Sequence, residues 1–89
     1  ISDVDAIQRN WSVFPNPTTG HLTLLHADGT LPEQIQLFNV DGRLVEQLDV
    51  ASSGGSSTLN IQRLATGVYR MCWEWNGSVF STPVHKIDP

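Results

Sequence analysis

Histidine and cysteine are the residue types in this sequence best suited to metal binding or nucleophilic catalysis. The chain holds three histidines, His21, His26 and His85, and one cysteine, Cys72. Their spacing matches no zinc signature, because such a signature places Cys and His ligands in short, closely spaced pairs. Cys72 lies in a strand-like run without the sharp turn of a catalytic nucleophile, and the chain has no Gly-x-Ser-x-Gly motif. We therefore predict histidines on strand faces, no metal, no cofactor and no enzyme activity.

The acidic residues are also poorly arranged for chemistry. Asp3, Asp5, Asp28 and Asp41 are candidate calcium ligands, but a calcium site needs about six oxygen ligands, which a dense loop of Asp, Asn and Gly would supply. Glu74 has no second carboxylate at a predictable distance, as glycoside hydrolysis would require. The carboxylates therefore indicate neither a calcium loop nor a hydrolase.

Aromatic residues offer a different kind of site. Trp11, Tyr69, Trp73, Trp75 and Phe80 are suited to a platform on which sugar rings stack, which would make the chain a carbohydrate-binding module. However, three of these residues share one parity of the run "VYRMCWEW", and a small domain needs such large side chains in its core. We favour the core role and expect Trp75, beside an Asn-Gly turn, to be partly exposed. Carbohydrate binding is kept as the alternative.

The elements that carry these residues are predicted to be β-strands, because apolar and polar residues alternate with a period of two. An Asn-Gly pair and two Asp-Gly pairs are typical of tight turns between such strands. About seven short strands with turns at this spacing favour an all-β fold, a small β-sandwich of antiparallel strands in two sheets. The predicted strands are approximately residues 11–14, 20–26, 34–40, 43–50, 57–62, 67–76 and 78–87.

Two predicted strands depart from regular alternation. Leu44 and Val45 are adjacent apolar residues, which predicts a β-bulge near Arg43. In "SVFSTPVHKI" neither parity is cleanly apolar, and Pro83 lacks the N–H that a ladder requires. We therefore expect this last run to be an edge strand or to break near Pro83. The Asp-Pro pair that follows Ile87 is also unfavourable for strand pairing.

The composition limits the function classes. The chain has 89 residues, enough for one small domain, and a net charge of −4. Its five Lys and Arg residues are scattered, which argues against nucleic-acid binding. No apolar run approaches the ~20 residues that span a membrane, and one cysteine allows no internal disulfide. Because the first residue is isoleucine, we expect a piece of a longer protein, in which residues 1–12 form a linker or loosely attached segment.

The stretch "FPNPTTG", which ends at Gly20, combines features that stiffen a chain. Pro15 and Pro17 hold φ near −65° and favour extended geometry in the residues before them. Asn16 can form a hydrogen bond within its own turn, and Gly20 allows a sharp change of direction. We therefore predict a rigid start to the sandwich, which acts both as a structural turn and as a reproducible surface for a partner.

Four sequence blocks occur in order: "FPNPTTG", "IQLFNVDGRLV", "LNIQRLATGVYRM" and a lysine near the end. In this combination the chain resembles the C-terminal sorting domain of the type IX (Por) secretion system, type A. The resemblance covers about residues 13–87, and residues 13–89 are expected to form the sorting domain. The residues that match the signature of the family are Pro15, Asn16, Pro17, Gly20, Asp41, Gly42, Arg43, Leu64, Gly67, Tyr69 and Lys86.

The resemblance implies a small immunoglobulin-like sandwich of seven strands that serves as an address label without catalytic duty. A family member is joined at its N-terminus to a cargo protein, which passes through the periplasm of a Gram-negative bacterium to the cell surface or extracellular space. The partners implied are the outer-membrane translocon and a surface sortase, which commonly removes the domain. The cleaved bond is then expected within or before residues 1–12. An inert immunoglobulin-like spacer in a secreted enzyme is a further hypothesis.

Two expectations concern individual parts of this signature. Gly67 is expected to supply backbone freedom ahead of Tyr69, whose ring would be buried while its hydroxyl is bonded at the edge. The final strand, which contains Lys86, is a candidate for strand addition by the export machinery, because an open sheet edge offers main-chain hydrogen bonds. Export after deletion of residues 78–89 would argue against that mode.

Overall fold

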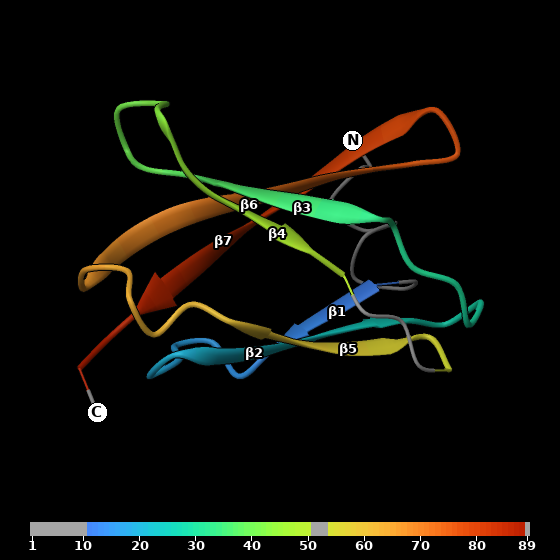
Figure 1. Cartoon of the computed structure of the whole chain (residues 1–89), viewed down its shortest axis with the longest axis horizontal. Coiled ribbons are helices and arrows are strands. Elements are labelled where there is room, and N and C mark those ends of the chain that lie inside the picture. Colours follow the sequence, from blue (N-terminus) through green and yellow to red (C-terminus); the bar gives the residue numbers. More distant parts are fainter. Residues whose placement is uncertain (1–10, 51–53, 89) are drawn as a thin grey trace.

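The computed structural model of the chain describes residues 11–50 and 54–88. In this part the chain forms seven β-strands and no helix, so no helix there could cross a membrane (Figure 1). Every predicted strand is present, with ends that differ from the predicted ones by at most two residues. The strands are β1 (Trp11–Phe14), β2 (His21–His26), β3 (Gln34–Phe38), β4 (Leu44–Asp49), β5 (Ser56–Asn60), β6 (Gly67–Trp75) and β7 (Ser78–Lys86).

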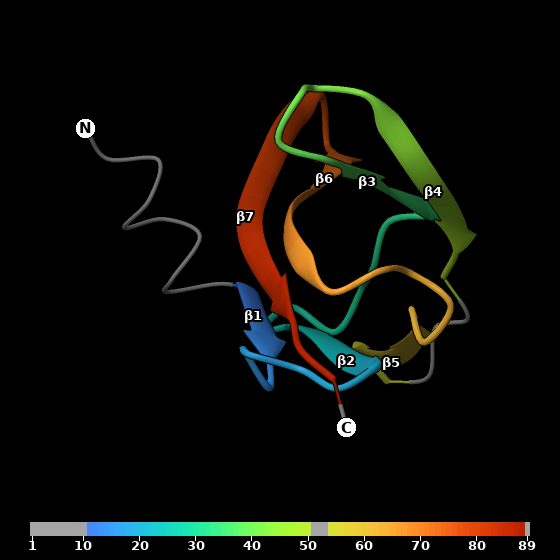
Figure 2. The same cartoon turned by 90° about the vertical axis from the view of Figure 1, so that its left-hand side faces the viewer.

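The strands form two antiparallel sheets that face each other across the core (Figures 1 and 2). One sheet has the order β1-β2-β5 and the other has the order β4-β3-β6-β7. In immunoglobulin constant domains the fourth strand pairs with the fifth, whereas here β4 pairs with β3. The predicted all-β sandwich of seven antiparallel strands in two sheets is confirmed.

Large apolar side chains from both sheets fill the space between them, as the period-two patterns predict. Met71 and Trp73 of β6 lie at alternate positions and are 0% and 1% exposed. The indole Nε1 of Trp73 is buried without a hydrogen-bond partner among the described residues. Trp73 therefore stabilises the core through the contacts of its ring. The core also contains Trp11, Leu22, Leu24, Ile35, Leu37, Leu59, Ile61, Tyr69 and Val84.

β4 contains the predicted irregularity. Leu37 faces Glu46, but the next residue, Phe38, faces Leu44, so Val45 is an extra residue in β4. One extra residue in one strand of an antiparallel pair is a β-bulge. The bulge predicted near Arg43 is confirmed, and its centre lies at Val45.

β7 runs unbroken through Pro83, so the alternative of a break at this residue is wrong. The N–H groups of His85 and Ile87 point away from β6 and donate to the segment 16–18. Because strand residues two apart point the same way, the nitrogen of Pro83 also faces away from β6, and no ladder hydrogen bond is lost. The predicted edge strand is confirmed, since β7 is the outermost strand of its sheet.

The β6–β7 hairpin has the two-residue loop that the Asn-Gly signal predicts. Asn76 and Gly77 have φ values of 52° and 79°, as a type I′ turn requires. The turn places Trp75 opposite Ser78 and thereby sets the register of the whole pair.

Candidate recognition site

The signature residues lie at one end of the sandwich, on the left of Figure 1 and facing the viewer in Figure 2. Gly67 pairs with Lys86 across the β6–β7 ladder, and Thr18 bridges Lys86 from the other side. The β3–β4 turn follows Phe38, which pairs with Arg70, near the same end of β6. We call this region the signature end and define it as residues 15–20, 39–43, 61–69 and 86.

The opposite end of the sandwich carries the β6–β7 turn and the start of β1. Trp11 pairs with His26 there, and Trp75 pairs with Ser78. The chain that precedes β1 therefore joins the sandwich at the end away from the signature. We call this the hairpin end.

Asn16 attaches the "FPNPTTG" stretch to the outer edge of β7. Its Nδ2 donates to the Pro83 carbonyl at 3.0 Å, and its Oδ1 accepts from the His85 N–H at 2.9 Å. These partners lie in the last strand rather than in the turn of Asn16 itself, where the sequence had suggested a bond. The side-chain amide thus takes the place that a backbone amide of a neighbouring strand would have. Pro15 and Pro17 flank it, both exposed and both preceded by cis peptide bonds.

Thr18 is a structural residue of this stretch that sequence reasoning missed. It is 1% exposed, and its carbonyl accepts from the Ile87 N–H at 2.8 Å. Its Oγ1 donates to the His21 carbonyl at 2.6 Å and accepts from the Gly20 N–H at 3.1 Å. One hydroxyl therefore satisfies two backbone groups in the bend that leads into β2. No local signal separates Thr18 from the exposed Thr19 beside it.

Gly20 occupies a place where no other residue fits. Its φ is +149°, a region that side chains disfavour. An added Cβ would collide with Cγ of Gln62 and lie 3.2 Å from the Gln62 Cα. The close approach is needed because the Gly20 carbonyl accepts from the Ile61 N–H at 2.8 Å. The sharp change of direction predicted at Gly20 is thereby confirmed.

The β3–β4 turn is organised by Asn39, another residue that sequence reasoning missed. Its Oδ1 accepts from the N–H groups of Asp41 and Arg43 at 2.9 and 3.0 Å. Gly42 has a φ of 81° and donates its N–H to the Asn39 carbonyl at 2.9 Å. The side chains of Asp41 and Arg43 are exposed, so they remain free of the turn itself. An Asn two residues before Asp-Gly is the local signal that identifies such a turn.

The Leu-x-x-Gly-x-Tyr block forms a tyrosine corner. Tyr69 is 8% exposed, and its hydroxyl donates to the Ala65 carbonyl at 2.5 Å. Leu64 packs against the core and donates its N–H to the Ile61 carbonyl at 3.1 Å. Immunoglobulin-like sandwiches use this arrangement at the corner between their fifth and sixth strands. The expected buried ring and bonded hydroxyl of Tyr69 are confirmed.

Replacing Tyr69 with phenylalanine removes this hydrogen bond and keeps the ring. The Ala65 carbonyl belongs to an exposed residue and can bind water instead. We therefore expect the free energy of unfolding to fall by about 1 kcal/mol, measured by urea denaturation. An unchanged midpoint would show that the corner bond contributes no net stability.

Gly67 does not supply the backbone freedom expected of it. Its φ is not in the positive region, and an added Cβ would come within 4.0 Å of only the Tyr69 ring. Gly67 faces Lys86 across the ladder. Directly opposed residues have neighbouring Cβ atoms, so the absent side chain leaves space beside the lysine stem.

Lys86 is a buried lysine, only 4% exposed, at the end of β7. It lies two residues after Val84 and so shares the inward-facing parity of this core residue. Its apolar stem therefore covers the core at the signature end. Its ammonium group makes no ion pair with the described residues.

These features define a small sandwich with a proline-rich edge, a tyrosine corner and an inward-facing terminal lysine. The family model for the secretion system C-terminal sorting domain matches residues 12–84, and three of the four signature segments lie in this range. The chain belongs to the family of type IX secretion C-terminal sorting domains. A search of the curated proteins finds no match. The resemblance inferred from the sequence is thereby confirmed, and Lys86 lies two residues beyond the matched range.

Aromatic rings fill the hairpin end of the sorting domain. Trp11 stacks on His26 with ring centroids 3.7 Å apart and planes 6° apart. Trp11 also contacts Trp73, Trp75 and Phe80, with centroids at 5.1, 6.1 and 5.5 Å. Trp11 and Trp73 are buried, as the favoured core role predicts, and Trp75 is half-buried as expected.

The histidines of the sorting domain lie on strands, as predicted. His21 and His85 are exposed, whereas His26 is buried with its Nδ1 2.6 Å from the Thr30 carbonyl oxygen. Within residues 11–50 and 54–88, no three His, Cys, Asp or Glu side chains are grouped closely enough to hold a metal ion.

Cys72 is expected to be a weak nucleophile in the folded domain. Burial raises the pKa of its thiol above the ordinary value, although the positive charge of Arg70 acts in the opposite direction. The folded state therefore holds the thiol proton more tightly than the unfolded state does. This adds to the stability of the fold at low pH, and the added stability is lost as the pH rises through the folded pKa of Cys72. We expect alkylation by iodoacetamide to rise at higher pH in the folded chain than in urea. Coincident pH profiles would contradict this.

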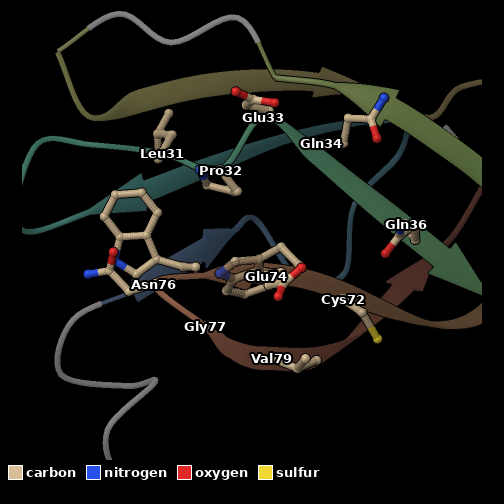
Figure 3. Close-up of a pocket in the computed structure, with 12 residues that line it drawn as sticks. Leu31, Pro32, Glu33, Gln34, Gln36, Cys72, Glu74, Asn76, Gly77 and Val79 are labelled. Carbon is tan, nitrogen blue, oxygen red and sulfur yellow. The ribbon is translucent and has the colours of Figure 1, made fainter.

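An open hollow of about 600 Å³ lies on the outer face of the four-stranded sheet, toward the hairpin end (Figure 3). β3 and β6 pair only from Gln36 to Phe38, so these strands diverge here. Figure 3 shows Glu33 and Glu74 on the two sides of the hollow. Its described lining contains these two carboxylates and no Lys or Arg, which disfavours anionic partners.

Proposed function

We propose that this domain is the signal that directs an attached parent protein across the outer membrane through the type IX system. Membership in the sorting-domain family supports this role and implies that the parent is a secreted protein. The single observation that carries the proposal is the convergence of four separate signature segments at one end of the sandwich. A cargo joined ahead of Trp11 would lie at the hairpin end and leave the signature end accessible.

The proposed partners are the outer-membrane translocon and a surface sortase, with the cargo joined covalently at the N-terminus. The parent passes through the periplasm, and the sortase then removes the domain. β1 begins at Trp11, whose ring is buried, so we place the cleaved bond before this residue. Residues 1–10 of the expected cleavage segment 1–12 lie outside the described residues. We propose that the sorting domain includes all of β1, which starts two residues before the expected range 13–89.

Strand addition along β7 is less favourable than the sequence suggested. The edge of β7 from Pro83 to Ile87 is already bonded to the segment 16–18. A partner strand would therefore be limited to residues 78–82 of this edge. Deletion of residues 78–89 would also remove the buried Val84 and so disrupt the core. That deletion tests folding rather than the edge.

A fusion experiment tests the proposed function. Residues 1–89 are joined to a periplasmic reporter in a type IX-competent bacterium and in a matched strain without the translocon. We expect the reporter at the cell surface or in the medium, without the domain, only in the competent strain. Retention in the periplasm of both strains contradicts the sorting role and favours an inert spacer. Surface reporter that still carries the domain contradicts removal by a sortase.

A further inference from the structure

A second hollow, of about 440 Å³, lies on the outer face of the four-stranded sheet beside the β3–β4 turn. We call it the turn groove and define it by its lining residues Phe38, Val40, Gly42, Val68, Arg70 and Pro83. The groove adjoins the Asp-Gly turn, strand β6, which carries Tyr69, and the final strand β7. Two of the four signature segments, the β3–β4 turn and the tyrosine corner, contribute to its lining.

The groove is apolar and open to solvent. Val40 is 82% exposed and Val68 is 49% exposed. Leu44 faces Phe38 across the β3–β4 ladder and is 48% exposed. Three of the six exposed large apolar side chains among the described residues thus gather here. Grouped apolar side chains on a surface mark an interaction site, whereas scattered ones do not.

The charge of the groove differs from that of the chain as a whole. Arg70 is the single charged residue of its described lining, although the chain has a net charge of −4. Its Nη1 donates to the Ser81 Oγ at 3.0 Å, and no carboxylate among the described residues pairs with it. Arg43, beside Gly42, is also exposed and makes no ion pair within the described part. Together with Arg70 it gives two positive charges near the groove, of which the negative charge of Asp41 offsets one.

We propose that the turn groove docks an apolar side chain of the export machinery, carried by a segment whose carboxylate pairs with Arg70. The apolar walls supply burial, and the guanidinium selects an acidic segment through charge-assisted hydrogen bonds. This inference rests on the proposed sorting function and names the surface through which it acts.

The first test introduces a charge into the groove. Val68→Glu and Val40→Glu place a carboxylate on an apolar wall, and Val79→Glu makes the same change at an exposed valine of the same sheet near the hairpin end. We expect surface reporter to fall at least about tenfold for the two groove variants and to stay within about twofold for Val79→Glu. Thermal unfolding identifies any variant whose fold is weakened. Equal export of Val79→Glu and a stably folded groove variant overturns the proposal.

The second test concerns the acidic partner. Arg70→Glu reverses the charge, Arg70→Lys keeps it, and Ser81→Ala removes only the hydrogen bond that orients the guanidinium. We expect export to fall about tenfold for Arg70→Glu and to stay within about threefold for the other two variants. Normal export of the reporter fused to Arg70→Glu overturns the proposal that a carboxylate of the partner pairs with Arg70.

A second copy of the chain is the rival occupant. Sedimentation of the purified chain measures its association, and a dimer that Val68→Glu dissociates without loss of export overturns the proposal. Failure of the sorting function itself has a different result, because then even the unaltered fusion stays in the periplasm.

Discussion

Replacing Gly20 with alanine is expected to lower the free energy of unfolding by about 2–4 kcal/mol. The φ of +149° disfavours any side chain, and the new Cβ would press against the Cγ and Cα of Gln62. Relief would require the Gly20 and Ile61 backbones to separate and would break their 2.8 Å hydrogen bond. Such a loss is large for a domain whose total stability is on the order of 5–15 kcal/mol.

Gly29→Ala is the matched control for this prediction. Gly29 also has a positive φ, +83°, but nothing lies within 4 Å of an added Cβ. Its replacement isolates the backbone cost, which we expect to be about 1–2 kcal/mol. If urea denaturation gave equal losses of unfolding free energy for the two variants, the close contact with Gln62 would not explain why position 20 needs glycine.

Replacing Thr18 with valine is expected to cost about 2–4 kcal/mol, although the two side chains have nearly the same shape. The valine leaves the Gly20 N–H and the His21 carbonyl without the Oγ1 that bonds both. The bond to the Gly20 N–H is buried, so water does not replace the partner that this N–H loses, whereas the His21 carbonyl belongs to an exposed residue. The bend that holds the proline-rich stretch against β7 should loosen as a result.

Thr19→Val provides the comparison, because Thr19 is adjacent and exposed. Its replacement should change the free energy of unfolding by no more than about 0.5 kcal/mol. Amide exchange of Ile87, whose N–H bonds the Thr18 carbonyl, should accelerate only in Thr18→Val. Similar stabilities for the two variants would refute the role assigned to the Thr18 hydroxyl.

The strands and their turns could be predicted because their signals are local. The alternation in β6 indicates that the side chains of Met71 and Trp73 face the core, and the Asn76-Gly77 pair predicts a two-residue turn. The bulge at Val45 was also visible, since two adjacent apolar residues cannot both face inward in a regular strand.

The candidate site was predictable only where a residue acts through its own backbone or a near neighbour. Tyr69 is such a case, with a bond four residues away, and the positive φ of Gly20 is local although its close contact with Gln62 is not. The Asn16 side chain and the Thr18 backbone bond residues near the far end of the chain, so no local pattern shows these partners. Gly67 was misjudged for the same reason, because the residue that it faces, Lys86, lies in another strand.

The proline in β7 shows how long-range pairing can reverse a local reading. Pro83 weakens a strand only if its nitrogen faces a partner strand. Here that side of β7 faces the segment 16–18, where Asn16 uses the Pro83 carbonyl instead. Pro83, which suggested a broken strand, therefore lies where the first signature segment bonds to the last strand.

The central claim is that the export signal is a folded end of the sandwich rather than a set of linear motifs. Leu37→Asp buries a charge at a fully covered core position and should unfold the domain while every signature residue is kept. Thr58→Asp adds the same charge at an exposed position of β5. The decisive measurement is the surface fraction of the reporter fused to each variant. We predict near-normal export for Thr58→Asp and a loss of at least about tenfold for Leu37→Asp, whereas normal export of a demonstrably unfolded Leu37→Asp domain would contradict the claim.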